Sequence, residues 1–279
     1  MREVCPEFYT RFACKASACR HSCCRGWEID VDGESAALYG ALPGALGEEL
    51  RAALVEDSAG FHFRLDAEKR CPFLRPDGLC RLILSLGEDA LCDICALHPR
   101  FFGELGDFTF AGLGLSCERV CELLLEDEAP LRFLCGGEPL TLAELLARLG
   151  VPGEGERLRF APPQDAASLA AMLARYGKTE PIDEAWPEEV ALLENALPAL
   201  VPAEAAAPRF DRILAYILFR QLPRLADTPA ERLLAFAQEA AQFVFLLTAQ
   251  SGDLAEALRR WSEQIEYDTD NVDILLRDL

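Results

Sequence analysis

The sequence has too little positive charge for several common classes of binding protein. It contains 27 Lys and Arg against 47 Asp and Glu, which gives a formal net charge of −20. Proteins that bind nucleic acid need a basic surface to neutralise phosphates, and anionic lipid headgroups attract basic rather than acidic segments. We therefore expect no nucleic-acid partner and no membrane partner.

Long apolar runs and an export signal are also missing. A transmembrane helix needs roughly 20 consecutive apolar residues. The most apolar run, from Leu233 to Ala249, is interrupted by polar residues between positions 238 and 242. The first residues contain no apolar segment of the kind found in secretory signals. These absences predict a cytoplasmic protein.

Familiar catalytic and nucleotide-binding motifs are lacking too. Gly112-x-Gly114 follows a strand-like stretch, but this pair of glycines is a weak indication of a nucleotide-binding turn. The sequence has no P-loop, His-Glu-x-x-His or Gly-x-Ser-x-Gly motif. Catalytic and cofactor-binding residues therefore stay unassigned from the sequence.

What the chain does have is 12 cysteines, all of them between Cys5 and Cys135. A chain of 279 residues can bury a core without disulfides, and a reducing cytosol disfavours them. Metal binding or redox chemistry is the expected role. Cys5, Cys121 and Cys135 are expected to be small buried core residues. The other nine are the predicted metal ligands: Cys14, Cys19, Cys23, Cys24, Cys71, Cys80, Cys92, Cys95 and Cys117.

The spacing of these cysteines favours a metal centre. Cys92 and Cys95 form a Cys-x-x-Cys pair, whose sulfurs can reach one ion or cluster. The adjacent Cys23 and Cys24 point in different directions, which suits a polynuclear cluster better than one zinc ion. Around the first group, residues 8–25 include four basic residues and no acidic one, which favours the thiolate that binds metal.

Thiolate ligands suit both iron–sulfur clusters and zinc. His21 and His98 lie within or just after the cysteine groups, so a mixed Cys/His zinc site stays open. A structural role is the simpler interpretation of His98. We favour an iron–sulfur cluster held by cysteines alone.

Periodicity predicts a mainly α (α+β) fold. Strands are expected at 26–31, 61–65 and 131–134, with a hairpin over 101–110. Helices are expected at 35–39, 47–55, 87–97, 117–126 and 142–149. The glycine- and proline-rich stretch 150–163 is typical of a linker. The pattern beyond it is almost wholly helical, with a capping box of Thr228 and Glu231 before the longest helix. We expect a cysteine-rich cluster-binding domain over 1–149 and an α-helical bundle over 150–279.

Five blocks of the sequence resemble the flagellin lysine-N-methylase family, in the same order. The blocks, which run over most of the chain, are Phe12-x-Cys14-x4-Cys19-x3-Cys23-Cys24-x2-Trp27, Cys71-Pro72-Phe73-Leu74 with Asp77-Gly78-Leu79-Cys80, Leu91-Cys92-x2-Cys95-x3-Pro99-Arg100, Gly114-Leu115-Ser116-Cys117-Glu118, and Ser262-Glu263-Gln264-Ile265-Glu266-Tyr267 with Asn271. The cysteine-rich opening also resembles a broader group of zinc- or iron-chelating proteins.

The resemblance implies an enzyme that transfers a methyl group from S-adenosylmethionine to a lysine side chain of flagellin or another protein. It also implies a [4Fe-4S] cluster held by the cysteine blocks. Groups that could orient the reacting amine are Trp27, Asp30, Asp32, Arg100 and Glu266, none of them assigned as catalytic. Two other hypotheses stay open: a non-enzymatic zinc- or iron-binding protein, and a redox sensor whose cysteines cycle between thiol and disulfide.

Overall fold

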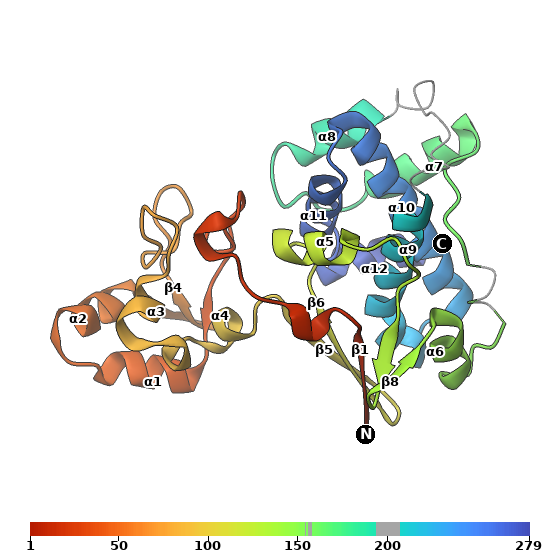
Figure 1. Cartoon of the computed structure of the whole chain (residues 1–279). Coiled ribbons are helices and arrows are strands. Elements are labelled where there is room, and N and C mark those ends of the chain that lie inside the picture. The colour runs from red at the N-terminus through yellow and green to blue at the C-terminus, as the bar shows by residue number, and fades with distance from the viewer. Residues whose placement is uncertain (154, 156–157, 194–206) are drawn as a thin grey trace. The chain divides into compact units, whose positions relative to one another are not determined.

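The computed structural model describes residues 1–153, 155, 158–193 and 207–279 (Figure 1). The chain forms two compact units. The larger unit comprises Met1–Phe12 and Arg100–Leu279, and the smaller unit comprises Ala13–Pro99. The smaller unit is therefore an insertion near the start of the larger one, and the expected boundary between residues 149 and 150 falls inside the larger unit.

The larger unit contains a five-stranded sheet in the order β5-β6-β1-β7-β8. Strand β1 lies at its centre, parallel to β6 and antiparallel to β7, with Val4 opposite both Phe110 and Cys135. This pairing explains why the first residues of the chain belong to the larger unit. The strands are β1 (Arg2–Pro6), β5 (Arg100–Leu105), β6 (Phe108–Leu113), β7 (Phe133–Cys135) and β8 (Glu138–Leu140). The expected hairpin is confirmed as β5 and β6, joined by a turn in which Gly106 has a φ of 56°.

Helices make up most of the larger unit. The longest, α10, packs against α9 and α11 and carries much of the core. By length and composition α10 could cross a membrane, but 61% of its most apolar window is buried inside the protein, as in a core helix. The helices are α5 (Glu118–Leu125), α6 (Leu142–Arg148), α7 (Ala166–Tyr176), α8 (Trp186–Leu193), α9 (Ala207–Gln221), α10 (Ala230–Ser251), α11 (Leu254–Gln264) and α12 (Thr269–Arg277).

The expected capping box before α10 is wrong. Pro229 occupies the N-cap position, and no side chain caps the helix. Thr228, one residue too early to cap, donates its hydroxyl to Asp227 at 3.1 Å.

Aromatic side chains join α9 to the sheet. The ring of Phe219 lies 4.9 Å from that of Phe133 and 5.8 Å from that of Phe110, between ring centroids. The buried Tyr216 hydroxyl accepts the N–H of Leu113 at 2.8 Å and donates to its carbonyl at 2.6 Å. The tyrosine thereby satisfies two backbone groups at the end of β6. Cys5, Cys121 and Cys135 are buried in this unit, which confirms their expected placement.

The smaller unit has its own core and a three-stranded sheet in the order β2-β4-β3. The ring of Phe63 packs 5.7 Å from Tyr39 and 5.0 Å from Phe73. The elements are β2 (Asp30–Val31), α1 (Gly33–Ala41), α2 (Gly44–Ala53), β3 (Leu54–Asp57), β4 (Gly60–Phe63), α3 (Arg81–Leu86) and α4 (Asp93–Leu97). Two small sheets together with many helices confirm the α+β class.

Two local expectations for the smaller unit differ from the structure. The helix expected over 87–97 is only a 3-10 turn (Glu88–Ala90) followed by α4, because Leu91 and Cys92 are extended. The strand expected over 26–31 shrinks to the two residues of β2.

Candidate metal centre

Five cysteines gather at the core of the smaller unit. Cys71 and Cys92 are buried in it, and Cys24, Cys80 and Cys95 are partly buried against it. Their sulfurs are close enough to interact electrostatically: Cys95 interacts with Cys24, Cys71 and Cys92, and Cys71 interacts with Cys80. We call these five residues the thiol cluster.

Backbone contacts bring the cysteine-bearing segments together. The N–H of Cys71 donates to the carbonyl of Cys24 at 2.9 Å. The segments of Cys71 and Cys80 are joined by a tight turn, in which Asp77 accepts the N–H of Leu79 at 3.2 Å and Gly78 has a φ of 79°. In α4, the N–H of Cys95 donates to the carbonyl of Cys92 at 3.0 Å.

The thiols of the cluster differ in acidity. A hydrogen bond from Cys23 outweighs burial and, with one from Ser22, lowers the pKa of Cys24 to about 7. The hydrogen bond between Cys92 and Cys95 lowers the pKa of Cys92, whose thiolate accepts it, and raises that of Cys95, the donor. Burial raises the pKa of Cys71 to about 12. The cluster therefore combines thiols of lowered pKa with thiols of raised pKa.

The other predicted ligands lie outside the thiol cluster. Cys23 is exposed, and its side chain forms a hydrogen bond with the sulfur of Cys24. Cys14 is also exposed, and its sulfur accepts the N–H of Ala16 at 3.3 Å. Cys19 is partly buried in the same N-terminal stretch of the smaller unit. Cys117 belongs to the larger unit, where it is the N-cap residue of α5.

The donor types fit a thiolate-bound metal, although the arrangement is not a ready-made ion site. Among the residues described, no three Cys, His, Asp or Glu side chains are placed to hold one ion. Besides the cysteine sulfurs, His98 at the end of α4 is a possible nitrogen donor. Its Nε2 atom is buried and has no hydrogen-bond partner within the described parts of the chain. Burial lowers the pKa of His98 and favours the neutral imidazole that binds metals. A metal would therefore find suitable donors, but only after side chains rotate toward a common point.

The candidate orienting groups are spread over both units. Asp30 and Asp32 line a cavity in the smaller unit. Trp27 lies in the loop before β2 and is partly buried. In the larger unit, the Arg100 guanidinium lies over the Phe12 ring, 5.4 Å from its centroid. Glu266, also in that unit, is buried and ion-paired with Arg220.

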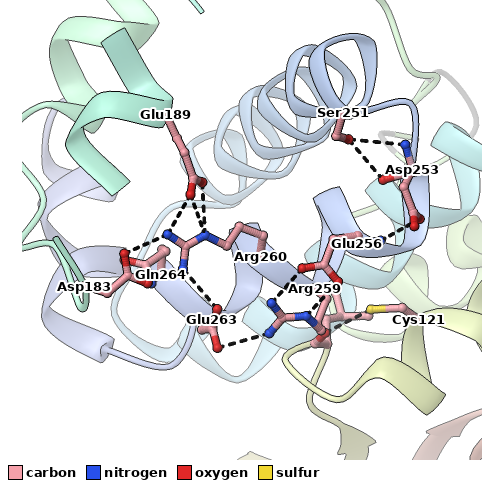
Figure 2. Close-up of polar contacts among 11 residues, drawn as sticks. Cys121, Asp183, Glu189, Ser251, Asp253, Glu256, Arg259, Arg260, Glu263 and Gln264 are labelled. Atoms are coloured by element: carbon pink, nitrogen blue, oxygen red, sulfur yellow. Dashed lines mark hydrogen bonds and ion pairs between the residues drawn. The ribbon is translucent and has the colours of Figure 1, made fainter. Parts of the chain in front are cut away.

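Arg259 and Arg260 of α11 form a polar network that includes Glu263 of the last sequence block and that the sequence did not predict (Figure 2). Arg260 forms ion pairs with Asp183, Glu189 and Glu263, and Arg259 pairs with Glu256 and Glu263. These contacts fasten α11 to α8 and to the loop before it. This pairing indicates a structural role for Arg259, Arg260 and Glu263.

Comparison with curated proteins finds relatives with related names. The lysine-N-methylase of Salmonella typhimurium is 32% identical over 128 residues, which cover 44% of this chain and 32% of that protein. The flagellar biosynthetic protein FliU of Salmonella muenchen is 31% identical over 128 residues, which cover 44% of this chain and 76% of that protein. The chain thus spans about a third of the length of this methylase. No family model matches the chain, and no solved structure matches it.

Proposed function

The chain belongs to the family of the lysine-N-methylases and FliU, and from that premise we propose that it transfers a methyl group from S-adenosylmethionine to a lysine side chain of a protein. Flagellin is the first substrate to test, because one relative is named as a flagellar biosynthetic protein. A cytoplasmic location is part of the proposal.

The thiol cluster is the observation that carries the cofactor part of this proposal. We assign it as the holder of a [4Fe-4S] cluster, with four ligands drawn from Cys24, Cys71, Cys80, Cys92 and Cys95. None of these five is in a disulfide. When bound, such a cluster with one iron free of cysteine would offer a coordination position to the amino and carboxylate groups of S-adenosylmethionine. Zinc is the alternative metal, with His98 as a further donor.

The protein's own contribution would be positioning. Methyl transfer requires a neutral amine in line with the methyl group, so orientation and proton removal supply much of the rate. The short segments around the thiol cluster, above all α4 and the turn before Cys80, would provide the frame for that alignment.

Metal analysis tests the proposal. We would purify the full chain without oxygen, record its visible spectrum, and measure iron, zinc and sulfide. We expect a broad absorption that bleaches on reduction, with about four irons and four sulfides per chain. The double variant Cys92→Ser/Cys95→Ser should lose the iron, whereas Cys5→Ala, a matched change in the core of the other unit, should keep it. Colourless protein with stoichiometric zinc would overturn the iron–sulfur assignment.

Methyl transfer is tested separately with labelled S-adenosylmethionine and flagellin. Incorporation into lysine is the expected result. Absence of transfer from protein with a full metal content would refute the methylase proposal and favour a metal-binding role.

A redox sensor is the second candidate, and the Cys92–Cys95 pair is what favours it. A thiolate hydrogen-bonded to a neighbouring thiol is the reduced form of a pair that can close to a disulfide. This candidate predicts a reversible disulfide in protein that holds no stoichiometric metal. Mass spectrometry of trapped thiols, before and after mild oxidation, distinguishes it from the methylase.

A further inference from the structure

A cavity of about 520 Å³ opens in the smaller unit between β2, β4 and the start of α4. Binding sites in proteins have volumes of roughly 300–1,000 Å³, so this one is large enough for an extended side chain. Every residue of its wall comes from the smaller unit.

The wall combines apolar and acidic groups. Ile94 supplies exposed apolar surface, and Val31 and Phe61, which pack in the core of the unit, also border the cavity. Four carboxylates share the wall with them: Glu28, Asp30, Asp32 and Asp93. A lysine side chain has the matching composition, because its four methylenes need apolar contact and its terminal ammonium needs negative charge.

The negative charge of this wall is not compensated by the protein. Among the residues that the structure describes, no Lys or Arg forms an ion pair with any of the four carboxylates. Asp32 accepts the backbone N–H groups of Ser35 at 2.8 Å and of Asp93 at 3.0 Å, and the Ser35 hydroxyl also donates to it. The nearby His62 has its Nδ1 atom 3.7 Å from Asp57, outside the group of four. A cation that enters the cavity therefore meets carboxylates that have no competing basic partner.

The cavity shares α4 with the thiol cluster. Asp93 and Ile94 line the cavity, and they lie between Cys92 and Cys95 in the same short helix. The charge of Asp32 is close enough to act on the Cys92 thiol. A group held in the cavity would thus lie beside the proposed metal centre.

We propose that this cavity captures the charged side chain of the substrate lysine, with the ammonium among the four carboxylates and the methylenes against Ile94. The inference rests on the proposed function, whose substrate site it specifies. Carboxylates favour the protonated amine, so the role that we assign to the cavity is capture and not deprotonation.

Peptide binding tests this proposal without any methyl transfer. The probe is a fluorescent flagellin-derived peptide with one lysine, compared with the same peptide carrying norleucine, which keeps the methylenes and lacks the amine. Fluorescence anisotropy with the full chain at low salt should give at least tenfold tighter binding of the lysine peptide. Higher salt should reduce that preference.

Two charge-removing variants locate the binding to the cavity. Glu28→Gln and Asp30→Asn change exposed side chains for which the structure gives no hydrogen bond or ion pair, so folding should be preserved. Each should weaken lysine-peptide binding by about three- to tenfold and leave norleucine-peptide binding unchanged. Glu48→Gln, an exposed change of the same charge in α2 outside the cavity, is the matched control and should bind like the wild type.

The outcomes separate this inference from the methylase proposal. Failure of the wild type to bind, equal binding of the two peptides, or unchanged binding by both Glu28→Gln and Asp30→Asn would each overturn the cavity assignment. Methyl transfer with an unchanged KM in both variants would overturn it too, while leaving the methylase intact. Selective lysine binding by a protein that transfers no methyl group would uphold the cavity and refute the methylase.

Discussion

The ion pair between Arg220 and Glu266 lends itself to a quantitative prediction. Its atoms Nε and Oε1 are 2.8 Å apart, and the two side chains are only 13% and 1% exposed. The Ser262 hydroxyl also donates to Glu266, at 2.9 Å. Arg220 donates to the Leu113 carbonyl at 3.2 Å, and its guanidinium lies 4.7 Å from the centre of the Phe101 ring. The pair therefore connects α9, α11 and the sheet.

We expect Arg220→Met to reduce the free energy of unfolding by about 3–5 kcal/mol near neutral pH. Removing one partner of a buried ion pair leaves the other charge without compensation, and losses of this size are usual for such changes. Since a domain is stabilised by only about 5–15 kcal/mol in total, the loss would be a large fraction.

The loss should depend on pH in a defined direction. Burial raises the pKa of Glu266 even with Arg220 opposing it, and removal of the arginine raises it further. The folded variant then keeps a proton that the unfolded chain releases above about pH 4.3, so the folded state binds more protons. Its stability must fall as pH rises above that value, by at most about 1.4 kcal/mol per pH unit, until the folded-state pKa is reached.

Urea denaturation at pH 5 and at pH 7.5 measures both effects. The variant should be closer to the wild type at pH 5. The double variant Arg220→Met/Glu266→Gln removes both charges but keeps an oxygen for the Ser262 hydroxyl, so it should recover at least half of the loss. A single-variant loss below about 1 kcal/mol, a loss that does not grow with pH, or a double variant no better than the single one would refute the reasoning.

Two further changes test local contacts. Tyr216→Phe leaves the buried N–H of Leu113 without its side-chain partner, while the Leu113 carbonyl keeps Arg220, and the change should cost about 1–3 kcal/mol in urea denaturation, with the apolar packing preserved. Asp32→Ala removes the cap of α1 at Ser35 and the contact to Asp93, and should cost about 1 kcal/mol. These backbone hydrogen bonds lower the pKa of Asp32 to about 2, so its contribution is complete above the unfolded pKa of about 3.9 and is lost as pH falls toward 2. A wild type and an Asp32→Ala variant that lose stability equally between pH 4 and pH 2 would contradict this account.

Local patterns in the sequence predicted elements whose partners lie nearby. The hairpin over 101–110 was predictable because apolar residues alternate on both sides of a glycine-bearing turn. Strand β1 was not, because Arg2–Pro6 is short and its partners β6 and β7 come about a hundred residues later. The division of the chain into units depends on the pairing of β1 with β6 and β7. Local composition gives no information about that distant pairing.

The candidate site shows the same limit. Spacing identified the cysteines as a group, and it connected Cys92 with Cys95 as a Cys-x-x-Cys pair. It did not show that the backbone of Cys71 pairs with that of Cys24, or that Cys117 belongs to a different unit from the other eight. The cavity was also beyond reach, because Asp30 and Asp93 come together only through the contact of β2 with α4. The ligand roles of the nine cysteines stay predictions.

Because the cysteine-rich unit is an insertion, it can be considered for deletion as one continuous segment. The chain leaves the larger unit after Phe12 and re-enters it at Arg100, and these two residues contact each other. Both ends of the inserted segment are therefore anchored at one spot on the host. If residues 13–99 were removed, a short glycine–serine linker could join Phe12 to Arg100. The five-stranded sheet that contains β1 would keep every strand. The cysteine-rich segment can thus be removed from the sequence without interrupting any strand of the five-stranded sheet.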